Sequence, residues 1–480
     1  MVASIVRFQH NKIASLLIVF TAWKVLLLIT ALLSPGPGYD TSTQLLFRGF
    51  GVNSTLPSTT TTGGRLAQKL TRWDAIYFAS TAERGYQYEQ EWAFGSGFTR
   101  AIAYLAKHVP LTKSTFLNTT YHAIILANLS HLLSVFVLHR LALALPLGKK
   151  ENTSSFAFVA ATLHILSPAG LFLSAPYGES TFSLLSFLGQ LLYVSSYSTS
   201  PKSYGIKNDT FLLFAGICFC LSSTVRGNGL LSGILLLHDA CLWACMVLDR
   251  LSVPILSIKI IPAIFRDAVH EFPSRRMPAT VIAGLLVGIG FATPQYVAWG
   301  DYCSADVANK RPWCDRLPPS IFSWVQKEYW GVGFMRYWTI SNMPLFLLAA
   351  PMLYIMARTA SLAITGRCDA TLARETGNPE DRNRNPKTDA TDGVANKRRD
   401  ALLFRLALPQ LTLAVLALTS FHVQIITRIS SGYPLWYLVL AREITDGGKN
   451  GMRFAKWTVR WMVMYALIQG VLFASFLPPA

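Results

Sequence analysis

Polar side chains interrupt apolar sequence at four places in this chain of 480 residues. At the first place, residues 72–94, the Asp74 carboxylate follows the Trp73 indole, and Glu89 comes further on. An indole suits the headgroup depth of a bilayer, and a carboxylate beside it can face an aqueous cavity. Such a carboxylate acts as a general base when its pKa lies near the working pH. The alternative is an interfacial helix in which Asp74 is only the N-terminal cap.

The second place is residues 167–180, where prolines and glycines break an apolar run just before Tyr177 and Glu179. Irregular backbone at membrane depth is tolerated where it lines a cavity, so both side chains are candidates for the wall of a site. The alternative is a tight turn with Glu179 near a helix N-terminus, where the helix dipole favours a negative charge.

The third place contains an isolated cation, Arg226, followed by Asn228, and Arg428 repeats this pattern in a later apolar run. An arginine at the centre of a membrane helix costs about 2.5–3.5 kcal/mol on insertion scales, so it usually has an anionic partner. A phosphate is one such partner, because the guanidinium group forms a planar fork for its oxygens. The alternative is that these side chains extend to the membrane interface.

The fourth place is a loop, residues 302–334, in which Cys303 and Cys314 flank a polar segment. On an oxidising side of the membrane we expect these cysteines to pair, which would stabilise the loop by about 3 kcal/mol in the chain-entropy model. The later part of the loop mixes aromatic with polar side chains, among them Gln326, Tyr329 and Trp330. Such a surface suits a sugar or a lipid headgroup, and an interfacial aromatic belt is the alternative.

Long apolar runs supply the elements that must position these side chains. The chain is 52% hydrophobic and 14% charged, whereas about a quarter of the residues of soluble proteins are charged. We therefore predict an all-α, polytopic membrane bundle of about eleven spans: 13–33, 121–145, 155–175, 179–197, 210–226, 229–248, 279–299, 343–357, 402–420, 425–441 and 457–476. The first span is expected to be a retained anchor and not a cleaved signal peptide.

The charges of the connections predict their sidedness. The formal net charge is +18, and the Lys and Arg residues cluster in short connections, which the positive-inside rule places in the cytoplasm. Membrane orientation, and not nucleic-acid binding, therefore explains the charge. Residues 34–120 and 300–342 then become lumenal loops, which also contain glycosylation sequons at Asn53 and Asn118.

The predicted organisation has three parts. Residues 1–365 form a transmembrane bundle with catalytic lumenal loops at 34–120 and 300–342, and residues 401–480 add the C-terminal transmembrane helices. Between them, residues 366–400 contain almost no large apolar side chains, so we expect a disordered cytoplasmic insertion.

The polar stretches resemble, in the same order, those of the GPI mannosyltransferase 2 (PIG-V) family. The resemblance covers most of the chain outside the insertion and the termini, and it rests on residues 72–94, 167–180, 226–229 and 312–338. The sequence departs from the family where Tyr77 replaces a frequent His and where residues 95–97 replace a Phe-Pro-rich run. These departures concern the acceptor-side contacts of the first loop and leave Asp74 in place.

The resemblance implies a multi-pass enzyme of the endoplasmic reticulum membrane, of glycosyltransferase C type, with a lumenal active site. It would transfer mannose in α1,6 linkage from dolichyl-phosphate mannose to the first mannose of a glycosylphosphatidylinositol (GPI) precursor. Asp74 matches the first-loop Asp of the family and would be the catalytic base. The predicted substrate-binding residues are Trp73, Glu89, Tyr177, Glu179, Arg226, Asn228, Gln326, Tyr329, Trp330 and Arg428.

The same resemblance implies no cofactor, since the donor is already activated, and gives no reason to expect a metal. The expected partners are the two lipid substrates and the membrane, and no nucleic acid is expected. A small membrane partner subunit is a further option that the sequence does not decide. Two other functions remain at this stage. A lumenal mannosyltransferase of asparagine-linked glycan assembly would share the donor, and a lipid transporter would use the same polar residues as a pathway.

Deleting the predicted insertion, residues 366–400, should leave mannosyl transfer intact, because its composition cannot bury a core. Transfer activity of membranes that contain the deletion variant measures this directly. Loss of activity in a variant that is normally expressed and localised would contradict the prediction.

Overall fold

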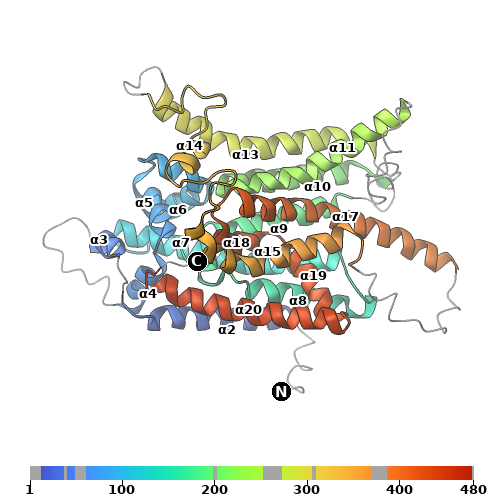
Figure 1. The fold of residues 1–480 in the computed structure, drawn as a ribbon, viewed down its shortest axis with the longest axis horizontal. Helices are drawn as coiled ribbons and strands as arrows, with labels where there is room; N and C mark the ends of the chain where they lie inside the picture. Colours follow the sequence, from blue (N-terminus) through green and yellow to red (C-terminus); the bar gives the residue numbers. More distant parts are fainter. Residues whose placement is uncertain are drawn as a thin grey trace.

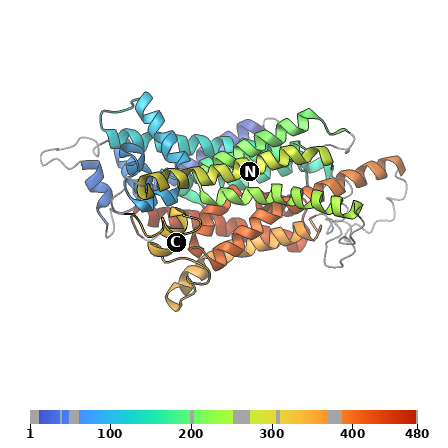
Figure 2. The same ribbon diagram turned by 90° about the horizontal axis from the view of Figure 1, so that it is seen from above.

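The computed structural model describes residues 12–36, 40–48, 61–197, 203–251, 273–304, 310–368 and 386–477. Every regular element in this part of the chain is helical, and the longest helices run lengthwise beside one another (Figure 1). The view from above shows the same lengthwise packing (Figure 2). The predicted all-α bundle is therefore confirmed.

Eight helices within the described ranges are long and apolar enough to cross a membrane, which confirms a multi-pass membrane protein. At 1.5 Å per residue, a helix of 20 residues already spans the hydrocarbon core. The eight are α2 (Lys12–Leu33), α7 (Thr115–Ala144), α10 (Ile206–Val225), α11 (Gly233–Arg250), α13 (Met277–Cys303), α15 (Met343–Ile364), α17 (Pro386–Thr419) and α20 (Lys449–Ala474).

Three further predicted spans, 155–175, 179–197 and 425–441, are short or interrupted helices. The main helices in these segments are α8 (Thr153–Ile165), α9 (Glu179–Ser195) and α19 (Leu435–Thr445), with 13, 17 and 11 residues. All of residues 435–443 are buried. A helix that packs against protein on all sides need not match the thickness of the bilayer, so the predicted count of eleven spans is not confirmed.

Shorter elements gather at one end of the bundle, on the left in Figure 1. They are α3 (Ser42–Arg48), α4 (Thr62–Leu70), α5 (Asp74–Arg84), η2 (Glu89–Phe94), α6 (Gly97–His108) and α14 (Ile321–Glu328). The segment after α20 reaches the same end, since Phe476 stacks on Trp73 with 5.1 Å between the ring centroids. Single turns connect the longer helices: η3 (Lys150–Asn152), η4 (Gly170–Leu173), η6 (Gly227–Ser232), η8 (Ser274–Arg276), η9 (Ile340–Asn342), η11 (Val423–Ile425), α18 (Ile426–Ile429) and η12 (Ser430–Gly432).

A buried acid holds helices together in another part of the bundle. Asp239 of α11 lies 3.1 Å from Arg276 Nε, just before α13, and 3.4 Å from Arg405 Nε of α17. It also accepts a hydrogen bond of 3.0 Å from Tyr193 of α9. Because a buried charge needs partners of this kind, Asp239 joins four helices by one ionic cluster.

The predicted disordered insertion, 366–400, is wrong at its C-terminal boundary, because α17 already begins at Pro386. Residues 369–385 lie outside the described part of the chain. At either side of them, Cys368 is buried, and Arg399 Nη1 donates to the carbonyl oxygen of Pro146 at 3.4 Å. A deletion that tests dispensability is therefore best confined to residues 369–385.

One of the two sequons does not support the predicted topology. Asn118 is buried in α7, where its amide donates to the carbonyl oxygen of Ala106 at 2.9 Å and accepts from the backbone N–H of Leu111 at 2.7 Å. A side chain engaged in this way is not accessible for glycosylation. Asn53 lies outside the described residues.

Candidate active site

The helix α5 begins at Asp74 because the preceding residue turns the chain sharply. Trp73 has φ 55° and ψ −130°, a costly conformation for a residue with a Cβ, so the surroundings must hold it. Its indole stacks on Phe476, and the carbonyl oxygen of Arg72 accepts a hydrogen bond of 3.3 Å from the Tyr177 hydroxyl. Since Trp73 is the N-cap residue and Asp74 the first helical residue, Asp74 is not an N-terminal cap.

Four charged side chains alternate in sign across the site. Arg428 Nη2 donates to Asp74 Oδ2 at 2.8 Å, and Arg428 Nε lies 3.3 Å from Glu179 Oε1. Arg226 Nη1 lies 2.6 Å from the same Glu179 oxygen. The formal charges of the two carboxylates and two guanidinium groups cancel, so the isolated cations of the sequence pair inside the protein and do not extend to the interface.

Glu179 is the buried centre of this charged row. No part of its side chain is exposed, whereas 30% of the Asp74 side chain is exposed and can meet a substrate. The angles of its two ion pairs lie outside hydrogen-bond geometry, so neither Glu179 oxygen accepts a hydrogen bond from the described residues. Glu179 is the first residue of α9, where the helix dipole favours a carboxylate, as the alternative interpretation of the sequence expected.

Two rings fix the position of Arg428. Its guanidinium carbon lies 5.1 Å from the centroid of the Phe172 ring and 5.3 Å from that of Tyr177, both within the range of cation–π attraction. Both rings come from the interrupted segment between α8 and α9. The break in these helices therefore supports the cation that pairs with Asp74.

A cavity of about 240 Å³ opens beside the charged row. Six predicted site residues line it: Asp74, Arg226, Asn228, Gln326, Trp330 and Arg428. The remaining wall is largely apolar or aromatic and consists of Tyr77, Ala93, Phe94, Gly227, Phe322, Phe421, His422, Ile425 and Ile429. A mostly apolar cleft with a few convergent charges is the usual form of a small-molecule site.

The other predicted substrate-binding residues do not line this cavity. Glu179 and Tyr177 lie behind Arg428, and Trp73 holds the turn before Asp74. Glu89 and Tyr329 contact each other, with the Tyr329 hydroxyl donating to Glu89 Oε2 at 2.6 Å. The structure therefore brings Asp74 and Glu179 together with the two arginines, and it separates Glu89 from them.

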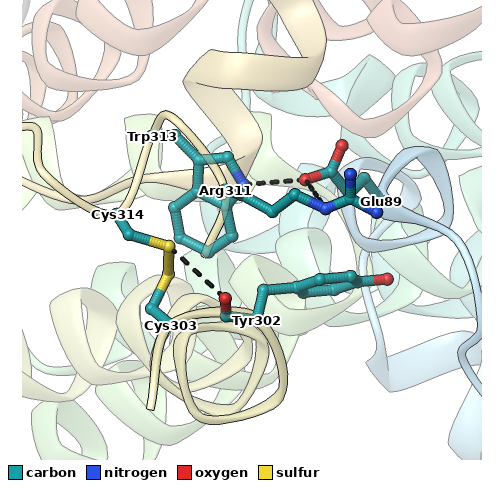
Figure 3. The surroundings of a disulfide bond; sticks show 6 residues. All are labelled: Glu89, Tyr302, Cys303, Arg311, Trp313 and Cys314. Atoms are coloured by element: carbon teal, nitrogen blue, oxygen red, sulfur yellow. Dashed lines mark hydrogen bonds and ion pairs between the residues drawn. A yellow bond between two sulfur atoms is a disulfide. The ribbon is translucent and has the colours of Figure 1, made fainter. Parts of the chain in front are cut away.

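Glu89 instead connects the first loop to the disulfide-containing loop (Figure 3). Its Oε1 accepts a hydrogen bond of 2.9 Å from the buried indole N–H of Trp313. Trp313 precedes Cys314, and a disulfide joins Cys314 to Cys303 at the end of α13, with 5.4 Å between their Cα atoms. The disulfide and Glu89 together hold this loop against η2.

His422 is a wall residue that the sequence analysis missed. Its Nε2 lies 3.2 Å from the carbonyl oxygen of Trp330, which can only accept, so Nε2 carries the proton and Nδ1 is the basic atom. Burial lowers the pKa of His422, which keeps the ring neutral at pH 7. Its sequence signal was a single His in the short turn between two apolar runs, beside Ser420 and Phe421.

Two glycines after Phe94 allow a close approach of the backbone. Gly95 has φ +83°, and a Cβ there would lie 2.5 Å from the carbonyl oxygen of Val225; a Cβ on Gly97 would lie 2.3 Å from Thr224 Oγ1. The backbone N–H of Ser96 donates to the carbonyl oxygen of Thr224 at 2.8 Å. The first loop thus packs closely on the end of α10, next to Arg226.

Comparison with known proteins places this site in an enzyme family. The family model described as "Mannosyltransferase (PIG-V)" matches residues 13–480. This chain belongs to the PIG-V mannosyltransferase family. Proteins named GPI mannosyltransferase 2 are similar to it over nearly their whole length: that of Aspergillus oryzae is 38% identical, covering 98% of this chain and 96% of that protein. That of Gibberella zeae is 39% identical, and the match covers 98% of this chain and 99% of that protein.

Solved structures offer a weaker comparison for this PIG-V family mannosyltransferase. An Archaeoglobus fulgidus oligosaccharyltransferase, tethered to an acceptor peptide, aligns with a TM-score of 0.45 and 9% identity over 96% of this chain and 56% of that protein. A score at this level does not establish a shared fold. Family membership therefore rests on the sequence, and the cavity beside Asp74 is the candidate active site of a mannosyltransferase.

Glu89 is expected to stabilise the loop and not to touch substrate. Glu89→Ala leaves the buried Trp313 N–H unpaired, which costs about 1–3 kcal/mol. Thermal unfolding should therefore begin at a lower temperature, while transfer per folded enzyme changes only a few-fold. A Glu89→Gln variant of normal thermal stability that loses transfer a hundredfold or more would instead place Glu89 at the substrate.

Proposed function

We propose that this enzyme transfers mannose in α1,6 linkage from dolichyl-phosphate mannose to the first mannose of a GPI precursor. The observation that carries the proposal is the Asp74–Arg428 pair, 2.8 Å apart in the wall of the cavity. It joins a candidate base to a candidate phosphate-binding cation. The identity of 38–39% to proteins named GPI mannosyltransferase 2 supports GPI as the acceptor class.

The proposed reaction is a single inverting displacement. The acceptor hydroxyl oxygen forms a bond to the anomeric carbon of mannose as the bond from that carbon to the phosphate oxygen breaks on the opposite face. Asp74 takes the hydroxyl proton. Negative charge grows on the departing dolichyl phosphate, and Arg428 and Arg226 are the cations available to stabilise it.

The resting ion pairs suggest how donor binding prepares the base. Arg428 occupies Asp74 Oδ2, while its contact with Glu179 lacks hydrogen-bond geometry. A phosphate offers the guanidinium group a bidentate, charge-assisted partner. We infer that the donor phosphate draws Arg428 away from Asp74, which frees the carboxylate to accept a proton, so the donor binds before the acceptor reacts.

The proposal places the enzyme in the endoplasmic reticulum with the Asp74 end in the lumen. The positive-inside rule supports this orientation, because it assigns Lys149, Lys207 and Arg250 to the cytoplasmic connections. The donor supplies an activated mannose, so the proposed reaction uses no cofactor and no metal. A small membrane subunit that assists the enzyme remains part of the proposal.

Asp74→Asn should lower turnover by about 10²–10⁴-fold, because the amide keeps the size of the carboxylate but cannot take a proton. The assay uses labelled dolichyl-phosphate mannose with a one-mannose GPI precursor, and an asparagine-linked glycan acceptor tests the alternative function. Glu83→Gln is the matched control, since Glu83 is exposed on the same helix outside the cavity lining. Near-normal transfer by Asp74→Asn would remove Asp74 as the base and direct attention to His422.

Arg428→Gln should reduce kcat by about 10²–10³-fold and raise KM for the donor, because one cation of the leaving phosphate is lost. Arg428→Lys should recover part of the activity, since it restores the charge without the planar fork. Arg336→Gln, at an exposed arginine outside the cavity lining, is the control. An unchanged donor KM together with a raised acceptor KM would assign Arg428 to the acceptor.

A further inference from the structure

One face of α20 carries cations in consecutive turns. Lys449, Arg453, Lys456 and Arg460 are exposed and recur at intervals of four, three and four residues, which is the spacing of one helix face. They line a groove of about 710 Å³ together with Trp457, Trp461, Met452 and Met464. We call the four cations Lys449, Arg453, Lys456 and Arg460 the basic stripe.

The same face becomes apolar beyond Arg460. Met464, Ile468 and Val471 continue the spacing and are 58%, 55% and 37% exposed. The opposite face of α20 is buried against the bundle through residues such as Phe454, Met462 and Ala466. The exposed face is thus cationic for about three turns and apolar for the next three.

The cations of the basic stripe form no ion pairs within the part of the chain that the structure describes. None of its four cations has a carboxylate within 4.0 Å among the described residues, although other arginines of the bundle are paired with acids. The stripe also lies far from the active site. The chain after α20 contacts Trp73 beside Asp74, and Lys449 is at the start of this 26-residue helix, about 39 Å away along its axis.

We propose that this face binds an anionic phospholipid of the membrane leaflet at that end. The lipid phosphate would contact the basic stripe, and an acyl chain would lie along Met464, Ile468 and Val471. Trp461 lies between these two regions and Trp457 lies beside the last turn of the basic stripe, and indoles favour the boundary between headgroups and hydrocarbon.

The length of the basic stripe favours a bound anion over simple solvation. From Lys449 to Arg460 the helix rises about 16 Å, whereas one headgroup layer is only about 5–8 Å thick. Lys449 and Arg460 therefore cannot both lie within one headgroup layer on an upright helix. A phosphate held beside the deeper turns neutralises Lys456 and Arg460 where solvation is poorest.

Lipid selectivity tests the proposal. The purified full-length protein is incubated with phosphatidylserine and phosphatidylcholine in equal amounts, and bound lipid is measured by native mass spectrometry. The test variant replaces all four stripe residues by Gln. The control variant carries Lys149→Gln, Lys150→Gln, Lys207→Gln and Arg250→Gln, which removes the same charge from exposed residues outside α20.

The protein and the control variant should retain phosphatidylserine in preference to phosphatidylcholine, and the stripe variant should lose about tenfold or more of this preference. Single variants Lys456→Gln and Arg460→Gln should each show part of the loss, which provides the test if the fourfold variant does not fold. Equal retention of both lipids by the unaltered protein would overturn the proposal. A preference that the stripe variant keeps, accompanied by loss of a co-purifying membrane protein, would overturn it in favour of a protein partner.

Discussion

The site depends on one buried carboxylate, Glu179, held between two arginines. A buried acid without a cation is strongly destabilising, so Arg226 and Arg428 must both approach the start of α9. This requirement brings together the end of α10, the short helix α18 and the first turn of α9. Once Arg428 Nε lies there, Nη2 of the same guanidinium group reaches Asp74 on α5. Glu179 therefore organises a site in which it does not itself line the cavity.

The interrupted helices make this arrangement possible within a membrane. The chain breaks between α8 and α9, where free carbonyl groups would be costly in lipid. Buried Lys24 of α2 donates to the carbonyl oxygen of Leu173 at 2.9 Å and to Ser174 Oγ at 2.7 Å. The first helix therefore supplies a hydrogen-bond donor for polar groups that the break leaves without helical partners. The same break supplies Phe172 and Tyr177 for the cation–π contacts of Arg428.

The sequence predicted the helical bundle and six residues of the cavity wall. Arg226 and Arg428 could be recognised because charged side chains in apolar runs must find partners inside the protein. The sequence could not predict which partners meet, since that depends on how distant helix ends pack. Glu89 was predicted to bind substrate together with Glu179, yet it holds a loop through Trp313. His422 gave little signal as a single residue. The predicted count of eleven spans is not confirmed, because an apolar run in the sequence does not distinguish a short helix buried in protein from a helix that crosses the bilayer.

The central claim is that Arg428 exchanges Asp74 for the donor phosphate. A structure of the enzyme bound to dolichyl phosphate, determined by cryo-electron microscopy, measures this exchange directly through the distance from Arg428 to both groups. The account predicts hydrogen-bond contact between the Arg428 guanidinium and the phosphate, with the 2.8 Å bond to Asp74 broken. A phosphate bound elsewhere, with that bond intact, would contradict it.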